Sequence, residues 1–78
     1  MQIVLSPRAA KQLNRMNEPL KGRIKSAISM LPQGDIVKLE ARQGFRLRVG
    51  GFRVLFGVHD NTIVITDILP RGQAYKGR

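Results

Sequence analysis

The sequence predicts an α+β fold in the order β-α-α-β-β-β, with a helical hairpin packed on one face of an antiparallel sheet of about four strands. Three observations support this prediction. Apolar residues recur at helical spacing as far as Leu31, they alternate with other residues from Phe45 onward, and short turns rich in Gly, Asp and Asn divide the alternating part. Each element would expose an apolar face if it stood alone, so helices and sheet must cover one another.

The first half of the chain reads as a short strand followed by two helices. Residues 2–5 form the strand candidate, and Ser6-Pro7 follows as an N-cap with proline at the first helical position. Asn17-Glu18-Pro19 interrupts the helical pattern and restarts it. The apolar stripe of the first helix comprises Ala9, Leu13, Met16 and Leu20, and that of the second comprises Leu20, Ile24, Ala27, Ile28 and Leu31. The turn at residues 32–35 ends the second helix.

The second half reads as three strands joined by tight turns. Residues 45–49 alternate, Gly50-Gly51 forms a turn, and residues 52–59 alternate again. Asp60-Asn61 forms a second turn before a last strand at residues 62–69. We therefore expect an antiparallel meander and a single domain over residues 1–78.

Three arginines lie inside the most apolar part of this meander. Because side chains alternate along a strand, Arg46 and Arg48 point away from the face that carries Phe45, Leu47 and Val49. Arg53 is likewise opposite to the apolar residues Phe52, Val54 and Phe56. The Gly-Gly turn makes the two strands neighbours, so we expect the three guanidinium groups to cluster on the face that the helices leave uncovered. Such clustering costs stability unless an anion binds there, although a merely solvated basic face is the alternative.

Composition points to an intracellular protein with a polyanionic partner. The 78 residues carry 14 Lys and Arg against 5 Asp and Glu, a net charge of +9, and contain no cysteine. Disulfides and cysteine-based zinc sites are thereby excluded. No apolar run approaches the ~20 residues of a membrane span, and the N-terminus does not resemble a signal peptide. We expect a cytoplasmic protein without a membrane partner that binds nucleic acid or an acidic protein.

A polar segment follows the last strand and contains Arg71, Lys76 and the only tyrosine, Tyr75. A strand that returns across the sheet would bring this segment to the edge of the arginine-bearing face. Arg71 and Tyr75 would then join the cluster, or Tyr75 would only close the edge of the sheet. Leu55, Ile68 and Leu69 are expected to be exposed apolar residues that a partner could cover.

Several stretches resemble the RelE/ParE superfamily of bacterial toxins from toxin–antitoxin modules. They are residues 5–9 (LSPRA), Lys38-Leu39, residues 45–54 (FRLRVGGFRV) and residues 70–75 (PRGQAY), within an element order that covers the whole chain. The resemblance implies a small fold like that of microbial ribonucleases, cleavage of mRNA in the ribosomal A site, and neutralisation by a cognate antitoxin. The central hairpin and the C-terminal motif favour the RelE branch over the ParE branch, whose members inhibit DNA gyrase.

By position, the resemblance gives catalytic roles to five residues: Arg46, Arg48, Arg53, Arg71 and Tyr75. We expect further RNA contacts from Lys38, Arg42 and Lys76. One departure from the family pattern concerns Arg46 and Arg48, where RelE-type enzymes often have lysine. Arginine does not lose its proton in proteins, so a general-base role cannot be transferred to these two positions.

The residue types present suit metal-independent RNA cleavage. The acidic residues are scattered without a metal-ligand pattern, so we expect no metal and no cofactor. Guanidinium groups can stabilise the phosphorane-like transition state, and Tyr75 is left to transfer protons, with Glu40 and the single histidine, His59, as lesser candidates.

Two other functions remain open: a gyrase inhibitor of the same fold and a non-catalytic basic RNA-binding module. An acidic or amphipathic antitoxin segment could lie across the basic face or against the helix pair.

Overall fold

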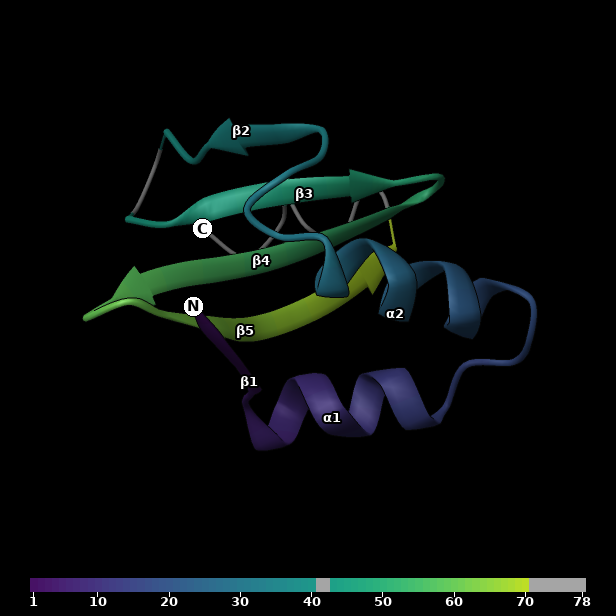
Figure 1. Ribbon diagram of the computed structural model, residues 1–78. Helices are drawn as coiled ribbons and strands as arrows, with labels where there is room; N and C mark the ends of the chain where they lie inside the picture. Colours follow the sequence, from purple (N-terminus) through teal and green to yellow (C-terminus); the bar gives the residue numbers. More distant parts are fainter. Residues whose placement is uncertain (41–42, 71–78) are drawn as a thin grey trace.

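A computed structural model describes residues 1–40 and 43–70 (Figure 1). The elements are β1 (Gln2–Leu5), α1 (Pro7–Asn14), α2 (Leu20–Ser29), β2 (Ile36–Lys38), β3 (Phe45–Val49), β4 (Phe52–His59) and β5 (Thr62–Pro70). Both helices lie on one face of the sheet (Figure 1), which confirms the α+β prediction. In the described ranges, neither helix is long and apolar enough to cross a membrane.

The sheet has five strands in the order β1-β5-β4-β3-β2, one more than the sequence predicted. The additional strand, β2, is three residues long and pairs antiparallel with residues 45–47 of β3. Three residues are too few for alternation to be recognised, so only the pairing with β3 reveals this strand. At the other edge β1 runs parallel to β5, whereas all other neighbouring strands are antiparallel.

The predicted starts and turns agree with the backbone. Ser6 is the N-cap of α1, where its Oγ accepts a 3.0 Å hydrogen bond from Ala9 N. Gly50, between β3 and β4, has a φ of 57°, which favours glycine. Asp60 and Asn61 both have positive φ, at 47° and 64°, the pattern of a type I′ turn.

The hydrophobic core lies between the helices and the sheet. It comprises Ala9, Leu13, Ile24, Ile28 and Leu31 from the helical hairpin and Leu47, Val54, Phe56, Ile63, Ile65 and Ile68 from the sheet. Two residues expected to be exposed are therefore buried: Ile68 is a core residue at 2% exposure, and Leu55, on the opposite face of β4, is 4% exposed. Leu69 is half-buried. The irregular register between β4 and β5 beside Leu55 and Phe56 sets which residues of β5 face the helices, and strand alternation alone does not predict it.

Side chains from the N-cap and the second half of α1 complete the outer edge of β5. β1 pairs only with residues 62–65, so the remainder of β5 extends beyond it. Ser6 Oγ donates a 2.9 Å hydrogen bond to Thr66 O, and Gln12 Oε1 accepts a 2.6 Å hydrogen bond from Ile68 N. These bonds fix α1 against the strand because they satisfy backbone groups that have no strand partner on that side.

Candidate functional site

The three central arginines lie on the sheet face opposite the helices, which we call the arginine face. Arg46 and Arg48 belong to β3, Arg53 belongs to β4, and Arg48 lies directly opposite Arg53. Arg46 lies opposite Leu55, two residues from Arg48 along the strand. The predicted clustering of these three residues is confirmed, because the two-residue turn sets the register of the hairpin.

The backbone brings Arg48 and Arg53 especially close. Arg48 N donates a 3.0 Å hydrogen bond to Asp35 O, so its amide points away from β4. Arg48 and Arg53 are therefore a pair without mutual backbone hydrogen bonds, for which Cα atoms are about 4.5 Å apart. Arg46 and Arg48 are about 7 Å apart along β3. Three positive charges thus originate within a small area of the sheet.

The surroundings of the three side chains differ, which strand alternation did not predict. Arg53 is only 4% exposed, and its Nη1 donates a 3.2 Å hydrogen bond to Phe52 O. Arg46 is half-buried, whereas the Arg48 side chain is 51% exposed. The expectation that all three emerge on an open surface is therefore wrong for Arg53. Arg48 is the most accessible to an incoming phosphate.

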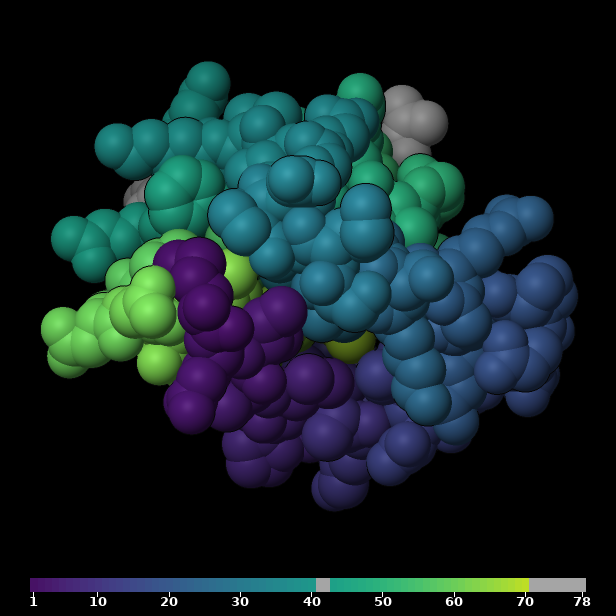
Figure 2. All heavy atoms as spheres, viewed as in Figure 1, coloured from purple at the N-terminus to yellow at the C-terminus, as the bar shows by residue number. Residues whose placement is uncertain are grey.

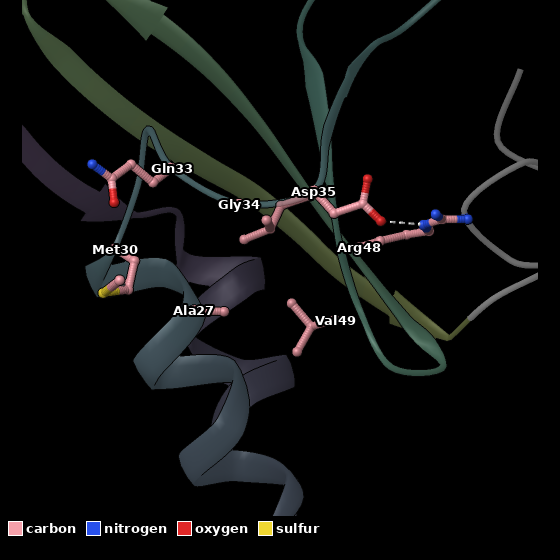
Figure 3. A pocket seen from close by; sticks show the side chains of 8 residues that line it. Ala27, Met30, Gln33, Gly34, Asp35, Arg48 and Val49 are labelled. Carbon is pink, nitrogen blue, oxygen red and sulfur yellow. Dashed lines mark hydrogen bonds and ion pairs between the residues drawn. The ribbon is translucent and has the colours of Figure 1, made fainter.

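Asp35 holds Arg48 from the turn that precedes β2. Its Oδ2 accepts a 2.7 Å hydrogen bond from Arg48 Nε, in an ion pair whose two side chains are about half exposed (Figure 3). The contact uses one of the five N–H donors of the guanidinium group. Sequence reasoning treated Asp35 as a turn residue only. The missing signal was β2, which sets the register that brings Asp35 beside Arg48.

A hollow of about 360 Å³ adjoins this ion pair (Figure 3). It lies between the end of α2, the turn before β2, and β3. Its lining comprises Ala27, Met30, Gln33, Gly34, Asp35, Leu47, Arg48 and Val49. The lining is mostly apolar, so Asp35 and Arg48 supply the charge at its rim.

Other predicted residues lie away from the arginine cluster. Lys38 is opposite Phe45, which packs against the core, so Lys38 lies on the helix side of the sheet edge. His59 is exposed at the far end of β4, about 20 Å along the strand from Arg53. Glu40 is exposed between β2 and β3. In residues 1–40 and 43–70, no three His, Asp or Glu side chains gather as metal ligands would.

Four predicted site residues lie outside the described residues: Arg42, Arg71, Tyr75 and Lys76. Their roles stay predictions from the sequence.

Comparison with known proteins identifies the family. The family model described as the ParE toxin of type II toxin–antitoxin systems, parDE, matches residues 3–75. The chain belongs to the RelE/ParE toxin superfamily. No protein of curated function matches the sequence.

Solved toxin structures share the fold of this RelE/ParE superfamily member. A chain of the RelE–RelB complex from Pyrococcus horikoshii is 24% identical with a TM-score of 0.77, and the match covers 92% of this chain and 96% of that one. A chain of the RelB–RelE complex from Methanococcus jannaschii has the same identity and TM-score, with coverage of 92% and 94%. The YoeB dimer from Staphylococcus aureus matches at 20% identity and a TM-score of 0.68, with coverage of 88% and 94%.

Proposed function

We propose that this toxin inhibits translation by cleaving mRNA, with the arginine face binding the scissile phosphate. The observation that carries the proposal is the direct pairing of Arg48 with Arg53, with Arg46 next along β3. Charge-assisted bonds from guanidinium groups strengthen as negative charge develops on the non-bridging oxygens. Arg46 and Arg48 are the more exposed and would contact the phosphate directly. Arg53 is buried and would add positive electrostatic potential at the phosphate without contacting it.

The proposed reaction is attack of the ribose 2′-oxygen on the adjacent phosphorus. The bond between phosphorus and the 2′-oxygen forms as the bond to the 5′-oxygen breaks, which leaves a 2′,3′-cyclic phosphate and a 5′-hydroxyl. One proton leaves the 2′-hydroxyl and one is delivered to the 5′-oxygen. Arginine cannot perform these transfers, so we assign them to Tyr75, with Arg71 as a further phosphate contact, from the sequence alone.

The RelE–RelB complexes of the two archaeal relatives support a protein partner. We propose that a cognate antitoxin neutralises this toxin. We also propose that its substrate is mRNA in the A site of the small ribosomal subunit. Because the toxin has few residues that can transfer protons, the ribosome would assist cleavage by orienting the mRNA. The site of action would then be the cytoplasm.

The test is single-turnover cleavage on ribosomes programmed with a defined mRNA. Arg46→Ala and Arg48→Ala should each slow cleavage by about 10²–10³, the usual loss for one transition-state donor. Lys38→Ala is the control because it removes one positive charge from the helix side of the sheet edge, away from the arginine face, and it should change the rate by less than about threefold. A larger loss would instead support the RNA contact predicted for Lys38 from the sequence. Thermal unfolding confirms that each variant folds. Wild-type cleavage rates in both arginine variants would refute the assignment.

A second candidate function is inhibition of DNA gyrase, which the match to the ParE family model favours. Expression in cells separates the candidates. Translation-dependent cuts in mRNA, mapped at their 5′ ends, support the nuclease. Double-strand DNA breaks with intact mRNA support the gyrase inhibitor. A block of translation with neither kind of cut would favour a non-catalytic RNA-binding module.

A further inference from the structure

The net positive charge of the described residues lies on the helical hairpin. Residues 7–30 contain six Lys and Arg and one Glu, a net charge of +5. The other described residues contain four Lys and Arg and four Asp and Glu, so their net charge is zero. In Figure 2 the hairpin extends from the lower part of the surface to its right-hand side, in indigo and blue. It packs on the sheet face opposite the arginine face. The protein therefore has a second basic surface that the proposed reaction does not use.

On α1, two cations point away from the sheet. Lys11 and Arg15 are four residues apart, hence on one side of the helix, and both are exposed. Ala9 and Leu13 are the buried residues of the helix and face the core. Arg8 is also exposed but forms a 3.3 Å ion pair with Asp67 of β5, so we do not count it in this surface.

On α2, cations flank a ridge of small residues. Gly22, Ser26 and Ser29 lie opposite the buried residues of the helix at the usual spacing of about 100° per residue. Lys21 and Lys25 lie on one flank of this ridge and Arg23 on the other. Gly22 N donates a 2.9 Å hydrogen bond to Glu18 Oε1, so the Glu18 carboxylate lies over the Gly22 end of the ridge. Ser26 and Ser29 form its low part, where a phosphate backbone can approach the flanking cations closely. We call Lys11, Arg15, Lys21, Arg23 and Lys25 the basic helix surface.

The basic helix surface lacks the exposed apolar side chains that a protein interface needs at its centre. Between residues 7 and 30, all of which the structure describes, Met30 is the only large apolar side chain that is strongly exposed, and it lies at the C-cap of α2. Protein interfaces have an apolar centre in which lysine is depleted. Nucleic-acid interfaces are instead more polar and strongly positive, which agrees with this surface.

The same segment lacks the side chains that bind single strands. Residues 7–30 contain no Phe, Tyr, Trp or His. Proteins that hold single-stranded nucleic acid combine cations with aromatic residues on which bases stack. Cations without aromatic residues suit the backbone of a duplex, where the bases are already stacked.

We propose that the basic helix surface binds the phosphate backbone of double-stranded RNA. The choice of RNA over DNA rests on the proposed function, whereas the preference for a duplex phosphate backbone rests on the surface itself. Because this surface and the arginine face lie on opposite sides of the sheet, one molecule can hold a folded RNA on its helices while the other face engages the strand to be cleaved.

The test is binding of a labelled RNA duplex of generic sequence, measured by fluorescence anisotropy over a range of salt concentrations. The variant Arg15→Gln/Lys25→Gln removes one cation from each helix and keeps helix propensity, because Gln, Lys and Arg are similar in this respect. Its affinity should fall on the order of 10-fold at physiological salt, and the slope of log Kd against log salt should fall by about 2. The control Gln2→Glu/Gln33→Glu makes the same change in net charge at two exposed sites outside the helices and should bind almost as wild type.

Three results would overturn the proposal. They are equal losses in the helix variant and the control, no loss in the helix variant, and tighter binding of a DNA duplex than of the RNA duplex. A helix variant that still binds RNA but no longer binds a co-expressed acidic antitoxin would assign the surface to protein instead. Arg48→Ala should keep duplex binding, so failure of the cleavage proposal and failure of this one can be told apart.

Discussion

Gln12 provides the sharpest test of how α1 is fixed to the sheet. Its Oε1 accepts a 2.6 Å hydrogen bond from Ile68 N, in the part of β5 that extends beyond β1. Ile68 is 2% exposed, so water cannot readily replace the lost acceptor. Gln12→Met keeps the length and the apolar stem of the side chain but leaves this amide unsatisfied.

An unsatisfied buried donor costs about 1–3 kcal/mol. For a protein of this size, each kcal/mol lowers Tm by about 4–8 °C, so we expect a fall of roughly 10 °C. The measurement is thermal and urea unfolding followed by circular dichroism, which yields the free energy of unfolding directly. Because α1 carries part of the core, its loosening should also lower the protection of β5 amides against hydrogen exchange.

The control is Gln33→Met, the same chemical change at an exposed glutamine in the turn after α2. It should change the free energy of unfolding by less than about 0.5 kcal/mol. If Gln12→Met were as stable as Gln33→Met, the hydrogen bond to Ile68 N would contribute nothing, and the argument that α1 completes the sheet edge would be wrong.

Three further predictions concern the turn, the core and the ion pair. Gly50→Ala should lower stability by about 1 kcal/mol because its φ is 57°, whereas Gly51→Ala, with equal open space but no positive φ, should be close to neutral in urea unfolding. Ile63→Ala should cost about 2–5 kcal/mol, since Ile63 is fully buried; a loss below 1 kcal/mol would show that the core collapses around the cavity. Asp35→Asn should alter stability by less than about 1 kcal/mol because the pair with Arg48 is half exposed. The KM of the Asp35→Asn variant for mRNA should fall because a negative charge is removed, and its kcat should fall because Arg48 is less well oriented. If neither KM nor kcat changed, Asp35 would not orient Arg48 for catalysis.

Local signals in the sequence determined most of the architecture. Ser6-Pro7 set the start of α1, and Gly50-Gly51 and Asp60-Asn61 set the two turns, because each of these signals acts through the φ, ψ or capping of its own residues. Alternation along β3 and β4 also placed the three arginines on one face. That inference needed only the period of two along a strand and a two-residue turn between neighbours.

Only the tertiary structure decided what surrounds each of these residues. β2 was not predicted, and the prediction therefore missed the contact of Asp35 with Arg48 and the position of Lys38 on the helix side of the sheet. The sequence also did not predict the burial of Arg53 and Leu55, since alternation gives the sheet face on which a side chain lies but not how deeply it is buried. The physical reason is common to all of these cases: the period of a strand depends on its own backbone, whereas register, pairing partners and burial depend on segments that are distant in the chain.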